Sequence, residues 1–230
     1  LHSLDARGIP HMLFVNKIDK ATITVQALLD ALQPISNKPM VLRHIPVQQG
    51  DDISGYIDLA SERAYHYQPG QASEVVELPG GEEDAFAEAR YGMLEALADF
   101  DDDLMEKVLE DITPEKDELY ANLTKDFQDG KIIPVLLGAA EQEGGLFRLL
   151  KALRHEVPSA DAAAARNGTD AATGTVAQVL KTYNTQHGGK LSIARVWDGE
   201  IKDGMTLNGQ RVSGMFRMMG AEQQKISSAL

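Results

Sequence analysis

The sequence predicts an α/β fold that contains an inserted α+β segment and is followed by part of an antiparallel β-barrel. Two short apolar runs, at 9–15 and 132–137, are each followed by a helical pattern, which is the unit of a doubly wound α/β sheet. The long stretch between these runs has a different pattern, and after residue 174 the pattern alternates as in antiparallel strands. With 230 residues, the chain is expected to form two or more compact units.

The two apolar runs are interpreted as buried parallel strands. Both IPHMLFV at 9–15 and IIPVLL at 132–137 lack alternation, which is typical of strands covered on both faces. A helix is predicted after each. TITVQALLDALQ has apolar residues at helical spacing and is followed by Pro34, and GLFRLLKALRHEV is followed by Pro158.

The stretch between the two strands is predicted to form the insert. From Met40 to about Leu78, short β-forming segments divided by Gly, Pro and Asp predict an antiparallel meander. Gly130 is expected to end the last helix of this stretch. Three acidic helices are expected before it, near 82–98, 102–111 and 114–128.

The negative charge of the chain is concentrated in these helices. The net charge is −13, and residues 82–129 hold 17 of the 35 acidic residues but only four basic ones. This surface would be repelled by the phosphates of DNA and would suit a basic protein partner. The alternative is that the acids form ordinary solvated helix faces.

The composition excludes several kinds of protein and site. There is no cysteine, so disulfides and thiolate metal sites are excluded, and a reducing cytoplasm fits. The six histidines lack metal-binding spacing, so we expect no metal site in this chain. No apolar run approaches the length of a transmembrane helix, and we expect no membrane partner.

The last part of the sequence is predicted to form a separate unit. The segment at 159–173 lacks apolar periodicity and is interpreted as a linker, although its alanine run could instead form a helix. Strands are expected at TVAQVLKTY and GKLSIARVW, and Asn208-Gly209 predicts a tight hairpin. We expect three or four strands in 174–230, with no closing element at the end, as in a barrel of which only part is present.

A polar motif, Asn16-Lys17-x-Asp19, directly follows the first predicted strand. Ligands of doubly wound sheets bind at the carboxyl ends of the strands. The Asp19 carboxylate can accept two parallel hydrogen bonds, from N1–H and the exocyclic amine of guanine, whereas adenine has no such pair of donors. Lys17 can lay its methylene stem on the purine face, and Asn16 can tie neighbouring loops together. The alternative is a polar turn in which Asp19 caps the next helix.

The second predicted strand ends in Gly138-Ala139-Ala140. Small residues allow a backbone N–H to approach a base closely, so the Ala139–Ala140 backbone is expected to face guanine O6. Small residues after a strand also serve simple helix–strand packing, which is the alternative. If both strands belong to one sheet, these residues and Asp19 would form the two halves of a guanine pocket.

These segments resemble elongation factor G, the translational GTPase that drives ribosomal translocation. GIPHMLFVNKIDK resembles the first guanine motif of that family in context, and IIPVLLGAAEQEGGLFRLLKAL resembles the second. GKLSIARVWDGEIKDGMTL resembles the first half of the β-barrel that follows the GTPase domain. The resemblance covers essentially the whole chain. The family usually has Gly-Ser-Ala in the second loop, so Ala139 stands in place of a serine.

The resemblance implies a domain organisation and a set of partners. The C-terminal part of a P-loop GTPase domain would occupy 1–40 and 131–158, an acidic subdomain would be inserted at 41–130, and the partial barrel would begin at 174. GTP and GDP would be the nucleotides. The ribosome would be the partner, through ribosomal RNA and, for the acidic part of the insert at 82–129, through the stalk protein.

The motifs for phosphate chemistry are absent from the 230 residues. No G-x-x-x-x-G-K-[ST] occurs, and this is the loop that cradles phosphates and seats Mg²⁺. Asp52-Ile-Ser-Gly55 has the form of the magnesium-side D-x-x-G motif, but it follows Asn16-Lys17-x-Asp19, which is the wrong order for the fold. We therefore expect a fragment without catalytic residues. The parent would hydrolyse GTP with Mg²⁺ ligands outside this chain, and the fragment alone would be inactive.

Two other functions stay open at this stage. The chain could be a non-catalytic protein-binding module whose acidic insert docks a ribosomal or other protein. It could also belong to a GTPase paralogue that acts in ribosome recycling, release or ribosome protection, since those relatives share these motifs.

Overall fold

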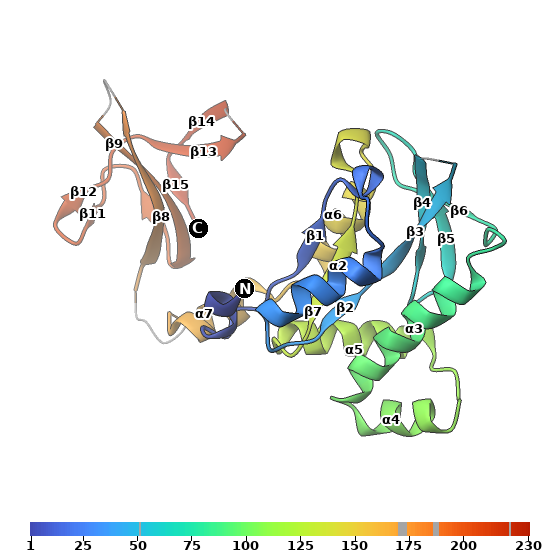
Figure 1. Cartoon of the computed structure of the whole chain (residues 1–230). Helices are drawn as coiled ribbons and strands as arrows, with labels where there is room; N and C mark the ends of the chain where they lie inside the picture. Colours follow the sequence, from blue (N-terminus) through green and yellow to red (C-terminus); the bar gives the residue numbers. More distant parts are fainter. Residues whose placement is uncertain (51, 170–173, 186–188, 221) are drawn as a thin grey trace. The chain divides into compact units, whose positions relative to one another are not determined.

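The chain forms two compact units, Leu1–Val157 and Pro158–Leu230 (Figure 1). The computed structural model describes residues 1–50, 52–169, 174–185, 189–220 and 222–230. Parallel and antiparallel sheets are combined with helices, so the predicted mixed α/β class is confirmed at this level.

A three-stranded parallel sheet lies at the centre of the first unit. Its order is β1 (Leu13–Val15), β7 (Ile133–Leu137) and β2 (Met40–Leu42). All five residues of β7 are buried, as expected for the middle strand of a covered parallel sheet. Leu13 pairs with Val135 and Val15 with Leu137, so β1 and β7 end at the same level.

Short helices connect and cover this sheet. Helix α2 (Val25–Leu32) begins after Thr24, whose Oγ1 accepts a hydrogen bond from the Ala27 N–H at 3.2 Å. Helix α6 (Leu146–His155) follows β7, close to the predicted range. The remaining elements here are α1 (His2–Asp5), η1 (Ile18–Lys20), η2 (Gln33–Ile35) and η3 (Ala140–Gln142).

The insert begins with an antiparallel meander, as predicted, but one segment was assigned to it wrongly. Its strands pair in chain order and are β3 (His44–Gln49), β4 (Asp52–Asp58), β5 (Arg63–His66) and β6 (Glu74–Val76). Met40–Leu42, in contrast, pairs with β7 in the parallel sheet. At Arg43 the chain passes from the parallel sheet to the meander. Local β propensity does not reveal this change of sheet.

Gly55 of the D-x-x-G look-alike has a structural role in β4. A Cβ at this position would lie 1.9 Å from the Tyr65 carbonyl oxygen of the neighbouring strand, so only glycine allows this close approach.

The three acidic helices form close to the predicted positions. They are α3 (Glu83–Ala98), α4 (Asp102–Leu109) and α5 (Lys116–Gln128). The Asp101 carboxylate caps α4 by accepting a hydrogen bond from the Leu104 N–H at 3.0 Å. Gly130 follows α5 with φ 67°, the left-handed conformation of a glycine helix stop.

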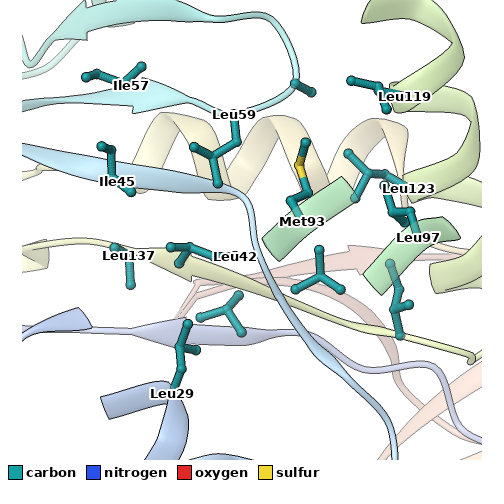
Figure 2. Packing of buried hydrophobic residues seen from close by; sticks show 14 of the residues in the cluster. Leu29, Leu42, Ile45, Ile57, Leu59, Met93, Leu97, Leu119, Leu123 and Leu137 are labelled. Atoms are coloured by element: carbon teal, nitrogen blue, oxygen red, sulfur yellow. The ribbon is translucent and has the colours of Figure 1, made fainter. Parts of the chain in front are cut away.

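The insert and the parallel sheet share one hydrophobic core (Figure 2). Leu42 and Leu137 come from the parallel sheet, whereas Ile57 comes from the meander and Leu97 and Leu123 from the acidic helices. Figure 2 shows these side chains gathered between strands and helices of both parts. The acidic helices therefore present apolar residues to the core and place most of their charge outside, with Arg90 of α3 and Asp126 of α5 as buried exceptions.

The second unit contains a helix and short antiparallel hairpins. Helix α7 (Ala160–Asn167) forms from the alanine run, the alternative that the sequence left open. The Ser159 hydroxyl accepts from the Ala162 N–H at 3.2 Å, and Gly168 ends the helix with φ 68°. Residues 170–173 of the expected linker lie outside the described residues.

The described part of the second unit has more strands than the three or four expected. The predicted strands are β8 (Val176–Thr185) and β9 (Gly189–Asp198), and Asn208-Gly209 joins β11 (Thr206–Leu207) to β12 (Gln210–Arg211). The others are β10 (Ile201–Lys202), β13 (Met215–Met219), β14 (Glu222–Ile226) and β15 (Ser228–Ala229). At the end of the sequence, β15 pairs with β10 in a two-stranded sheet, and the partial barrel stays a prediction. Both of these strands have only two residues, which is too short for any periodicity to reveal them.

Within the described residues, none of the helices combines the length and the apolar character needed to cross a membrane.

The shared core predicts a clear contrast between two leucines. Leu97 is fully buried, so Leu97→Ala is expected to lower the free energy of unfolding of the first unit by about 3 kcal/mol. Leu109 is 78% exposed, so Leu109→Ala is expected to change it by less than about 0.5 kcal/mol. Urea unfolding followed by circular dichroism measures both. Equal effects would contradict the shared core.

Candidate functional site

The loops that follow β1 and β7 meet at one edge of the parallel sheet. The Gly138 N–H donates to the Val15 carbonyl oxygen at 2.9 Å, and the Ile18 N–H donates to the Gly138 carbonyl oxygen at 3.2 Å. The strand pairing is therefore continued into the loops. All six residues that the sequence predicted to bind guanine lie in these two loops.

Asn16 links the two loops through its side chain. Its Oδ1 accepts a hydrogen bond from the Ala140 N–H at 2.9 Å. The side chain is exposed, so its amide can be re-oriented at little cost in packing.

Lys17 gives the first loop its sharp change of direction. Its backbone is left-handed, with φ 64° and ψ 36°, which costs a non-glycine residue about 1 kcal/mol. The turn η1 follows at once, and Ile18 enters the core with 7% of its surface exposed. The Lys17 side chain is exposed, which leaves its methylene stem accessible.

Asp19 is half-buried, and its carboxylate has no hydrogen-bond or salt-bridge partner among the described residues, although Lys20 interacts with it electrostatically. It does not cap α2, because Thr24 does so. The alternative interpretation of Asp19 as a helix cap is therefore wrong.

The second loop is a closed turn. The Ala139 N–H donates to the Gly144 carbonyl oxygen, and the Gly144 N–H donates to the Ala139 carbonyl oxygen, both at 3.0 Å. Gly138 packs so tightly that a Cβ would lie 2.3 Å from Phe14 Cζ. From the sequence alone, the backbones of both Ala139 and Ala140 were expected to face a guanine base. In the structure the buried Ala139 N–H is already used inside the turn, so Ala140 is the amide that a ligand can compete for.

An exposed ion pair links the outer ends of the loops. Lys20 Nζ lies 2.6 Å from Glu141 Oε2. This hydrogen bond raises the pKa of Lys20 and lowers that of Glu141, so both groups are held in their charged forms.

A second polar cluster, which the sequence did not reveal, is buried elsewhere in the first unit. Arg148 of α6 lies between two carboxylates, with its Nε 3.5 Å from Asp58 Oδ2 and its Nη1 3.3 Å from Glu156 Oε1. Arg43 also pairs with Glu156, and the Tyr120 hydroxyl donates to Asp58 at 2.8 Å. Burial, the largest influence, would raise the pKa of Asp58, but Arg148, the Ser61 N–H, Arg43 and Tyr120 together outweigh it and hold that pKa below its usual value.

Two small clefts lie over this cluster and not over the guanine loops. Their volumes are about 130 and 240 Å³, and Tyr120, Arg148 and Lys151 line both. None of the six predicted guanine-binding residues lines either cleft.

Comparison with known proteins gives a clear relationship. No protein-family model matches the chain. An elongation factor G-like protein from Synechocystis sp. is 42% identical over 228 residues, which are 98% of this chain and 34% of that protein. Over nearly its whole length, the chain is a homologue of part of this elongation factor G-like protein.

A solved structure is also similar to this chain. A crystal structure of a protein from Thermus thermophilus matches with a TM-score of 0.77 and 27% sequence identity, over 98% of this chain and 33% of that one. The present chain spans about a third of the length of the proteins it matches. It is thus similar, over nearly all of its residues, to about a third of each of these two longer proteins.

The close packing of Gly138 predicts that this residue cannot be enlarged. Gly138→Ala is expected to destabilise the first unit by about 2 kcal/mol, because the new Cβ would collide with Phe14 and with the Gly144 carbonyl oxygen. Gly80→Ala is the matched control, since nothing lies within 4 Å of a Cβ there. Thermal unfolding compares the two variants. If the two variants have the same melting temperature, the packing argument is wrong.

The buried cluster predicts a pH-dependent stability. The pKa of Asp58 is lower in the folded chain than its usual 3.8, so its contribution is complete above that pH and is lost as the pH falls towards the folded value. Asp58→Asn is expected to cost about 3 kcal/mol at pH 7, because Arg148 loses a buried partner. The difference in the free energy of unfolding between Asp58→Asn and wild type should shrink below pH 3.8. Urea unfolding from pH 7 to about pH 3 measures it, and a constant difference would contradict the assignment.

Proposed function

We propose that these residues carry the guanine-recognition loops of a translational GTPase resembling elongation factor G. The complete polypeptide would bind GTP and GDP and hydrolyse GTP to drive ribosomal translocation. The observation that supports this most is the meeting of Asn16-Lys17-x-Asp19 with Gly138–Ala140 at one sheet edge, joined by the hydrogen bond between Asn16 and Ala140. The homology to an elongation factor G-like protein supports the same proposal.

Each residue of the proposed site has a distinct role. Asp19 would accept from guanine N1–H and the exocyclic amine, for which its unpartnered carboxylate is suited. Lys17 would cover the purine face. Ala140 would donate its N–H to O6 when Asn16 releases it, and Gly138 and Ala139 would hold the turn in place.

The phosphate chemistry would come from other parts of the polypeptide. The 230 residues contain no G-x-x-x-x-G-K-[ST] loop, so they offer no residues that fit a phosphate-bound Mg²⁺. Catalysis of phosphoryl transfer rests on positioning and electrostatics around those phosphates. By themselves, these residues would therefore not hydrolyse GTP.

The partner of the complete protein would be the ribosome, including its RNA and, through the acidic helices at 82–129, its stalk protein. A second candidate is a non-catalytic module that uses those helices to bind a basic protein, and the local charge supports it. A paralogue role in ribosome recycling, release or ribosome protection would use the same loops.

Nucleotide binding by the complete polypeptide tests the proposal. Asp19→Asn is expected to weaken GDP binding by about tenfold or more, because a buried hydrogen-bonding group left unpaired costs about 1–3 kcal/mol. It should also shift the preference towards XDP, since xanthine has a carbonyl where guanine has its amine. ADP should bind neither form.

Asp52→Asn is the matched control, because it makes the same charge change at an exposed residue of the D-x-x-G look-alike. It should bind GDP like wild type. Equal or absent binding of GDP, ADP and XDP by the wild-type protein would refute the guanine site and favour the binding module.

A further inference from the structure

The insert contacts the second guanine loop directly. After β5, the chain brings Tyr67 and Gly70 to the turn at 139–144. The Gly70 N–H donates to the Glu143 carboxylate. Gly144 lies against the Tyr67 ring, since a Cβ on Gly144 would be only 3.1 Å from Tyr67 Cε2. Two residues of the turn are thus in contact with the insert.

The turn has a conformation that needs support. Glu143 is left-handed, with φ 59°, which is unfavourable for a non-glycine residue. Such conformations persist where the surroundings hold them. Inside the turn, the Gln142 and Glu143 N–H groups donate to the Ala139 and Ala140 carbonyl oxygens at 2.9 and 3.1 Å. Gly70 and Tyr67 provide the contacts from outside.

Tyr67 is itself held firmly by the insert. Its N–H donates to the Ser54 carbonyl oxygen at 2.9 Å, and its ring lies 5.7 Å from that of Tyr56. Its hydroxyl is buried without a hydrogen-bond partner among the described residues. Ring packing therefore fixes Tyr67, and the hydroxyl contributes little to the contact.

We propose that the insert positions the base-reading turn, with Glu143 and Tyr67 acting as positioning residues for guanine recognition. The inference rests on the proposed function, in which Ala140 donates to the base. Ala140 lies in the same closed turn, so a shift of the Glu143–Gly144 side moves its N–H away from the base. A displacement of the segment 67–70 would then change how fast guanine nucleotides dissociate.

The dissociation rate of a fluorescent GDP from the complete polypeptide tests this. Glu143→Ala is expected to raise the rate about fivefold, because it removes the single hydrogen bond that the Gly70 N–H donates to this exposed carboxylate. Glu143→Gln keeps an acceptor for the Gly70 N–H and should restore the rate to within about twofold of wild type. Tyr67→Ala should act like Glu143→Ala, whereas Tyr67→Phe should match wild type.

Glu77→Ala is the matched control. It removes an exposed carboxylate of the insert that has no hydrogen bond or ion pair among the described residues and lies outside the segment 67–70. Its rate should equal that of wild type. A second measurement, amide hydrogen exchange, needs no nucleotide. Glu143→Ala should speed the exchange of the Ala139 and Gly144 amides.

The outcomes separate the two proposals. If wild type binds GDP but the two alanine variants release it at the wild-type rate, or Glu77→Ala has the same effect as they do, the positioning role is overturned and the guanine site stands. Unchanged amide exchange in Glu143→Ala would also overturn it. A wild-type protein that binds no guanine nucleotide would overturn both. Glu143 is exposed, so its variants should fold.

Discussion

The parallel pairing of β1 with β7 is the interaction on which the candidate site depends. The two strands lie far apart in the sequence, yet Val15 pairs directly with Leu137. Both following loops therefore begin at the same level of the sheet, where Asn16 reaches Ala140. A slip of one residue would make the two loops begin at different levels and separate Asn16 from the Ala140 N–H. The register of β1 and β7 thus also assembles the site.

The insert is an integral part of the first unit. Its meander and acidic helices contribute to the same core as the parallel sheet. Buried charges reinforce this connection, because Asp58 of the meander pairs with Arg148 of α6 and Arg148 pairs with Glu156. A buried charge is strongly destabilising unless it is paired, so these groups favour one arrangement of insert and sheet. The contact of Gly70 with Glu143 brings this connection to the proposed base-reading turn.

In the proposed site, the two loops contribute differently to recognition. The Ala140 N–H is already bonded to Asn16, so a guanine carbonyl would exchange one hydrogen bond for another, with little net gain. The Asp19 carboxylate has no hydrogen bond to give up among the described residues, and only the charge of Lys20 acts on it. Selectivity for guanine over adenine would therefore come mainly from Asp19. Asn16 and the turn would control how well the base is enclosed.

Local patterns in the sequence were sufficient to determine the two apolar strands, the amphipathic and acidic helices, the Asn208-Gly209 hairpin and the polar motif after β1. Each of these depends on periodicity, capping or turn chemistry within a few residues. Only the tertiary structure showed that Met40–Leu42 leaves the meander for the parallel sheet and that Arg148 joins two buried carboxylates. It also showed that the Ala139 amide is used within its own turn. These features depend on which distant segments meet, and local propensity does not encode that choice.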